Sequence, residues 1–91
     1  MKTFKMPNGN ISGYYSFDDF DEIILNDELQ TLFCNHNNLN ELKLSHNLLN
    51  LFCWGNNIKE LYLNNRLITL ETDIYTNVEN INNPHLEILF S

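Results

Sequence analysis

A 19-residue period is the feature that most constrains how this chain can fold. When the sequence is written from Glu22 in rows of 19, like residues fall into shared columns. One column holds four glutamates and two hold four leucines each: Glu22, Glu41, Glu60 and Glu79; Leu29, Leu48, Leu67 and Leu86; Leu32, Leu51, Leu70 and Leu89. A short period sustained along a chain indicates stacked repeats, in which each unit packs mainly on its neighbours.

Each row also contains two short alternating segments. Leu32 and Cys34 alternate with polar or aromatic residues, and Leu42 and Leu44 repeat the pattern about ten residues later. Alternation of this kind is typical of an extended strand with one buried face. The sequence therefore predicts strands near residues 32–34, 42–44, 51–53 and 61–63. Helical spacing is not sustained in the Asn-rich connections, so we expect little helix.

These patterns predict a mainly β, right-handed parallel solenoid with coils of about 19 residues and two short strands per coil. The expected repeats are residues 22–40, 41–59, 60–78 and a partial 79–91. Residues 1–21 are expected to lie outside the register as an N-terminal capping segment, since the first apolar face must be covered. The turn signal from Pro7 to Asn10 favours a hairpin there, with a short helix after Ser16 as the alternative. Near residue 78 the path is expected to slip by one residue and bring Val78 and Ile81 inward.

Inward positions of the repeats form a predicted structural ladder. Its members are Leu29, Leu32, Cys34, Asn37, Leu48, Leu51, Cys53, Asn56, Leu67 and Leu70. The asparagines follow strands, where their amides can pair with backbone groups left free by the turns. We interpret the two cysteines as buried free thiols. A zinc site using them with His36 or His46 is the weaker alternative, because the spacing is not that of a structural site.

Outward positions carry an unusual set of aromatic residues. Phe33, Phe52 and Phe90 share one column, which Glu71 interrupts, and Trp54 stands in the next column before Asp73. Exposed aromatic rings with acidic neighbours are typical of protein interfaces. The candidate partner-binding residues are Phe33, Phe52, Trp54, Glu71, Asp73 and Phe90. Two other interpretations remain: the rings stack on one another, or residues 1–21 cover them.

The segment from Leu29 to Leu39 resembles the leucine-rich-repeat consensus L-x-x-L-x-L-x-x-N/C-x-L, with Cys34 in its third apolar position. Alternation of Cys-bearing and Leu-bearing half-repeats is similar to the short nested-period class, including the cysteine-ladder repeats of internalin J-type proteins. The composition is similar to that of repeat proteins from large DNA viruses of amoebae. The resemblance implies a leucine-rich-repeat fold and a binding function, without naming a partner.

Composition and motifs narrow the function classes. Five basic against twelve acidic residues, a net charge of -7, disfavour a nucleic-acid partner. No apolar stretch is long enough to cross a bilayer and no signal peptide is evident, so we expect no membrane partner and an intracellular, cytoplasmic location, with a virus-infected host cell as one setting. No catalytic motif, metal site or cofactor site is recognisable.

These exclusions leave two functional interpretations. The first is a non-catalytic protein-binding scaffold that presents an outward aromatic and acidic face to another protein. The second is a structural remnant or fragment of a longer array, which self-associates through its open C-terminal edge.

Overall fold

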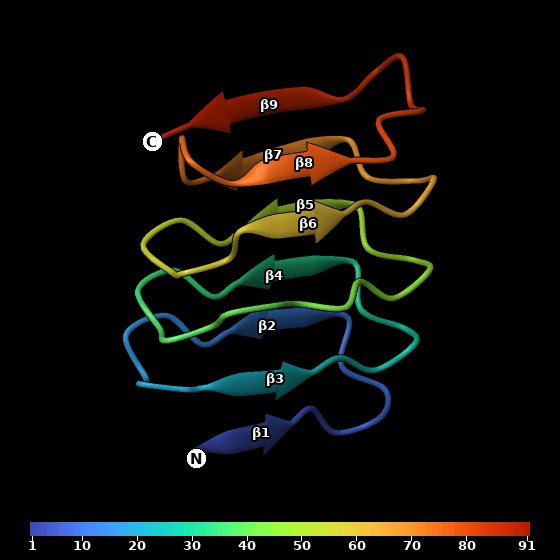
Figure 1. The fold of residues 1–91 in the computed structure, drawn as a ribbon. Coiled ribbons are helices and arrows are strands. Elements are labelled where there is room, and N and C mark those ends of the chain that lie inside the picture. The colour runs from blue at the N-terminus through green and yellow to red at the C-terminus, as the bar shows by residue number, and fades with distance from the viewer.

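The computed structural model describes all 91 residues and contains nine short β-strands and no helix. The strands are β1 (Thr3–Lys5), β2 (Ser12–Tyr14), β3 (Glu22–Ile24), β4 (Thr31–Phe33), β5 (Asn50–Phe52), β6 (Glu60–Tyr62), β7 (Thr69–Thr72), β8 (Asn77–Glu79) and β9 (Glu87–Phe90). Turns between them reverse the chain twice in every coil (Figure 1). No helix long and apolar enough to cross a membrane is formed.

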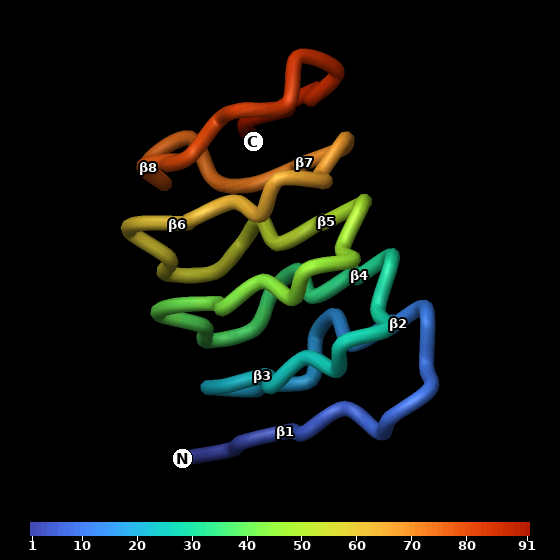
Figure 2. The backbone as a smooth tube through the Cα atoms, turned by 90° about the vertical axis from the view of Figure 1, so that its right-hand side faces the viewer, coloured from blue at the N-terminus to red at the C-terminus, as the bar shows by residue number.

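The coils stack so that the strands gather on two opposite sides (Figure 2). One side is a continuous parallel sheet of five strands in the order β2-β4-β5-β7-β9. The other side holds two separate parallel pairs, β1 with β3 and β6 with β8. From β2 to β7, the residues aligned across the sheet are 19 apart: Gly13, Leu32, Leu51 and Leu70. The predicted mainly β, parallel solenoid with one repeat in each coil is confirmed.

Residues 1–21 follow the same register as the repeats. Thr3 of β1 pairs with Glu22 of β3, and Gly13 of β2 pairs with Leu32 of β4, both in parallel. The predictions of an out-of-register segment and of a hairpin are therefore wrong. These residues form a first coil whose interior is filled differently: Gly13 stands in the column of leucines because Tyr15 crowds it, with a ring carbon 2.8 Å from where a Cβ would lie.

The register shortens towards the C-terminus. Leu61 of β6 pairs with Val78 of β8, and Leu70 of β7 pairs with Ile88 of β9, so both spacings fall short of the full period. Val78 packs against the core as predicted, but the slip on its side is two residues, and Ile81 is exposed. Glu79 consequently lies beside Tyr62 instead of extending the glutamate column.

The predicted strand at residues 42–44 is absent. No residue from Asn40 to Leu44 forms a backbone hydrogen bond, although Leu42 is buried. The third coil therefore contributes only one strand, β5, and the ladder on this side is interrupted between β3 and β6. In the column of residues 26, 45, 64 and 83, the side-chain amides of the three asparagines bond to carbonyls of the preceding coil. Ser45 replaces an asparagine there, and its hydroxyl is buried without a partner.

The interior is a single cluster of 15 buried apolar residues. All ten residues of the predicted structural ladder lie within the interior, Asn37 and Asn56 included. At the N-terminal end, the ring of Phe4 packs 4.6 Å from Tyr15 and 5.1 Å from Phe20, measured between centroids. These larger side chains fill the first coil, so the stacked leucines above are covered.

Candidate functional site

The outward face of the five-stranded sheet carries a ladder of stacked rings. Tyr14 of β2, Phe33 of β4 and Phe52 of β5 occupy neighbouring strands in register. The Tyr14 and Phe33 rings stack with centroids 5.4 Å apart, and Phe33 and Phe52 are 4.3 Å apart with an interplanar angle of 6°. Because the rings stack face to face, their edges, and not their faces, point towards solvent.

A second row of rings follows at the turns after these strands. Phe17 stacks on His36 with centroids 4.5 Å apart, and His36 meets Trp54 edge-on at 4.2 Å. We name the two rows together the aromatic strip: Tyr14, Phe33, Phe52, Phe17, His36 and Trp54. It crosses the first three coils on one side of the solenoid, so residues far apart in sequence form one surface.

The turn position shared by Phe17, His36 and Gly55 requires left-handed backbone, with φ of 61°, 54° and 78°. Glycine adopts this conformation freely, whereas a bulky side chain is strained there by roughly 1–3 kcal/mol. Gly55 has a second constraint, since a Cβ would lie 2.6 Å from Nδ1 of His36. The first two coils thus keep large rings where glycine would be unstrained.

Of the three interpretations of the outward rings, the structure contradicts one. Residues 1–21 do not roof the strip: Tyr14 stacks on one face of Phe33 only, and Tyr14 and Phe17, which are 71% and 73% exposed, extend the strip by one coil. The rings do stack on one another, and Phe33, Phe52 and Trp54 are half-buried as a result. Counting back one full period from Phe33 and His36 reaches Tyr14 and Phe17, so the repeat pattern could have located both.

The remaining candidate residues lie in three different settings. Glu71 is beside Phe52 on β7 and half-buried. The prediction that Phe90 continues the column is wrong, because the shortened register places Leu89 beside Glu71 and Phe90 beside Thr72. Asp73 is buried, and its carboxylate accepts hydrogen bonds from backbone N–H groups of Gly55 (2.8 Å) and Asn56 (3.2 Å). Of these three, only Glu71 adjoins the strip with its side chain accessible.

A ladder of buried amides supports the turns that carry the second row. The Asn56 amide donates to the carbonyls of Cys34 and Cys53, both at 3.0 Å. Its Oδ1 accepts from the backbone N–H groups of Asn37 (3.2 Å) and Leu39 (3.1 Å). Asn37 repeats this arrangement one coil earlier, accepting from Asp18 and Phe20. The asparagines therefore hold successive turns in register.

The two cysteines are buried and unpaired. Desolvation, with Cys53 nearby, raises the pKa of Cys34 well above its ordinary value. Burial likewise raises the pKa of Cys53 to about 12; the hydrogen bond to Thr72 opposes this rise, and Asp73 and Glu71 add to it. A metal-binding thiol must ionise, so these environments oppose ligation. No three His, Cys, Asp or Glu side chains gather in a metal-binding arrangement.

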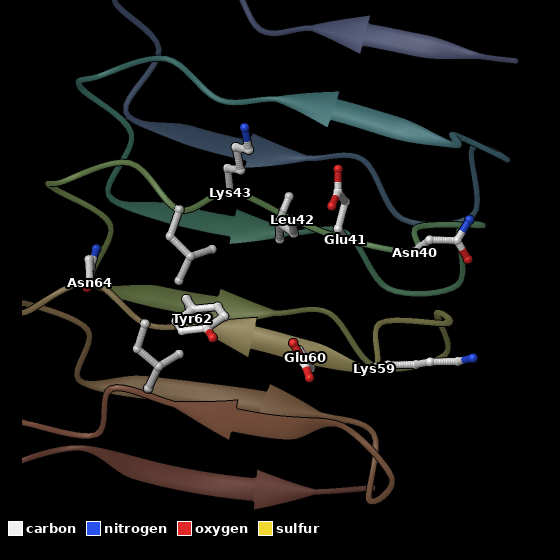
Figure 3. Close-up of a pocket in the computed structure, with 10 residues that line it drawn as sticks. Asn40, Glu41, Leu42, Lys43, Lys59, Glu60, Tyr62 and Asn64 are labelled. Atoms are coloured by element: carbon white, nitrogen blue, oxygen red, sulfur yellow. The ribbon is translucent and has the colours of Figure 1, made fainter.

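A groove of about 680 Å³ lies on the opposite side, between residues 40–44 and β6 (Figure 3). Glu41, Lys43, Glu60 and Tyr62 line it, and it coincides with the interruption in the ladder. Acidic and basic side chains alternate around this groove. The lining of the groove therefore favours neither an anionic nor a cationic ligand.

No protein-family model matches the chain, and neither a curated protein nor a solved structure matches it.

Proposed function

We propose that this chain is a non-catalytic protein-binding scaffold, with the aromatic strip and the neighbouring Glu71 as its contact surface. The observation that carries this proposal is at Phe17. Its backbone is held in the strained left-handed conformation, with φ of 61°, while the residue is 73% exposed. Strained residues persist where the surrounding structure holds them and are concentrated at functional sites. Large aromatic rings are also frequent components of interface centres, and carboxylates are typical of the polar rim around them.

Two features of the fold favour this side of the molecule over the other. The five-stranded sheet is continuous, so each ring of the first row stands on a strand bonded to its neighbours, and the second row stands at the turns that directly follow these strands. A surface fixed before binding loses less conformational freedom when a partner docks. The opposite side is interrupted at residues 40–44 and has no comparable row of rings.

Replacing Phe52 by serine is expected to abolish partner binding while the domain still folds. Because the ring is half-buried and stacked on Phe33, the loss of stability should be about 1–2 kcal/mol. Peptides selected from a random display library on the wild-type protein provide the measurement, with their affinities compared between variants. Trp54→Ser should give the same result.

Tyr62→Ser is the matched control, because Tyr62 is a 65% exposed aromatic residue on the opposite side. Selected peptides should bind this variant as they bind the wild type. The strip is not the contact surface if the peptides bind the Phe52→Ser and Trp54→Ser variants with unchanged affinity. The same conclusion follows if Tyr62→Ser is the variant that loses peptide binding.

Self-association is the second candidate function. Strand β9 pairs only with β7, so its far edge has unpaired backbone groups. Three exposed apolar residues lie in this region: Ile81, Leu89 and Phe90 are 55%, 59% and 45% exposed. An open apolar strand edge is a template for pairing with another chain.

Light scattering after size-exclusion chromatography separates the two candidates for this chain. The scaffold proposal predicts a monomer over a hundredfold range of concentration. Self-association predicts a mass that grows with concentration and that falls when Leu89→Lys places a charge on the edge. Growth that disappears in that variant would favour the second candidate over the first.

A further inference from the structure

The carboxylates around the aromatic strip outnumber the basic side chains. Four of the five basic residues lie elsewhere: Lys5 in the N-terminal coil, Lys43 and Lys59 by the groove of Figure 3, and Arg66 at a turn beside Asn47. Lys2 is the exception, since its ammonium bonds to the backbone carbonyl of Asp18 and lies over the ring of Phe20. The carboxylates nearest the strip are Asp18 and Asp19, which directly follow Phe17, and Glu71, beside Phe52. A partner that avoids repulsion here must be basic or neutral.

The three carboxylates are free to meet a partner. Asp18 uses only its backbone groups in hydrogen bonds, which join its N–H to Asn37 and its carbonyl to Lys2. The Glu71 carbonyl accepts from Cys53, while its carboxylate takes no hydrogen bond. Asp19 is exposed and unbonded. By contrast, the buried Asp73 carboxylate is already occupied by two backbone donors.

The stacking geometry leaves ring faces open only at the ends of the strip. A cation binds to the face of an aromatic ring and not to its edge. Within the first row Tyr14 and Phe52 cover both faces of Phe33, so open ring faces remain only at the two ends. At one end these are the faces of Tyr14 and Phe17, with Asp18 and Asp19 next in the chain. At the other end they are the faces of Phe52, beside Glu71, and of Trp54, which is not stacked face to face on His36. Each end therefore combines a ring face with a carboxylate, while the middle offers apolar ring edges.

We infer that the strip binds an extended basic peptide segment that carries one cationic side chain at each end and an apolar residue between them; the inference rests on the proposed function. Measured along the stacking direction, Glu71 and Phe17 are three coils apart, about 14 Å at roughly 4.8 Å per coil. An extended peptide covers this span in about four residues at roughly 3.3 Å each. The matching pattern is Arg-x-apolar-x-Arg, with all three side chains on one face.

The test is fluorescence anisotropy with the labelled peptide Gly-Arg-Ser-Leu-Ser-Arg-Gly. We expect saturable binding that weakens as salt rises and that is lost when glutamate replaces both arginines. A peptide of the same composition with the order Arg-Ser-Arg-Ser-Leu should bind at least fivefold more weakly. Equal affinity for the two orders would overturn the inferred spacing.

Variants of equal net charge separate a specific site from general attraction. Glu71→Gln and the double change Asp18→Asn with Asp19→Asn should each weaken binding about fivefold or more. Glu28→Gln, and Glu28→Gln with Glu60→Gln, remove the same charges away from the strip and should change affinity less than twofold. Equal losses in the strip and control variants would overturn the inference, as would tighter binding of the glutamate peptide.

Phe17→Gly is a variant in which a loss of peptide binding is not expected to come from a loss of stability. Glycine suits the left-handed position, so the midpoint of urea unfolding should stay within about 0.3 M of the wild type or rise. Peptide affinity should fall at least fivefold. If Phe52→Ser abolishes binding of library-selected peptides while the charge variants match their controls, the proposed function stands and the basic partner is wrong; if neither set has an effect, both fail.

Discussion

Replacing Asn56 by alanine is expected to remove about 5 kcal/mol from the free energy of unfolding, most of what a domain of this size has. The side chain forms four hydrogen bonds in the interior, and Ala can form none. The Cys34 carbonyl retains the amide of Asn37 at 3.1 Å. The backbone N–H groups of Asn37 and Leu39 and the Cys53 carbonyl are left without partners, at a cost of roughly 1–3 kcal/mol each.

Urea unfolding followed by fluorescence of Trp54, the single tryptophan, gives the measurement. Asn57→Ala is the matched control: the neighbouring side chain is exposed and forms no hydrogen bond, so its loss should cost less than about 0.5 kcal/mol. Similar unfolding free energies for the two variants would contradict the role assigned to the amide ladder.

The interior of the middle coils could be predicted from the sequence because alternation of inward and outward side chains is local. Leu32, Leu51 and Leu70 recur once in every coil and face the core, as their columns indicate. The first coil could not be recognised in this way. Its inward positions hold Gly13 and Tyr15, which differ in size from the leucine and cysteine of later coils while filling the same space together.

The irregular coils show the limit of periodicity. Two parallel strands in successive coils can pair residues that are a full 19-residue period apart or slightly fewer residues apart. The length of the turns between the strands decides which of these registers forms. The choice at β9 places Ile88 against the core and leaves Leu89 outside. Likewise, the alternation at Leu42 and Leu44 predicts a strand, but an extended segment becomes one only when its neighbours approach closely enough to bond.

The candidate site was predicted in part, for the same reasons. Phe33, Phe52 and Trp54 stand in regular coils, so their outward positions followed from the pattern. Phe90 was misplaced by the one-residue change of register at β9. Stacking of Phe17 on His36 depends on the left-handed turn, a conformation that a phenylalanine would not suggest.

Raising the pH from 8 to 10.5 is expected to lower the free energy of unfolding by roughly 2–3 kcal/mol through Cys53, with a further loss in the same direction through Cys34. Burial raises the pKa of Cys53 to about 12, and that of Cys34 also lies well above its ordinary value. In the unfolded chain a thiol ionises near pH 8.5. Below that pH, both thiols are protonated in both states and stability is independent of them; above it, only the unfolded state loses protons, until the folded pKa is reached.

Two thiols that ionise only on unfolding give a slope of about 2.7 kcal/mol per pH unit, since each contributes about 1.4 kcal/mol. Urea unfolding at successive pH values measures this slope. Cys53→Ala should halve it, and Cys34→Ala with Cys53→Ala should remove most of it, even though the smaller side chains lower stability at pH 7.

The same burial should keep both thiols of the folded wild type unreactive towards a disulfide reagent at pH 8 until urea is added. An unchanged alkaline slope in the double variant, or thiols that react rapidly in the folded protein, would show that the cysteines are not the groups that destabilise the solenoid at high pH.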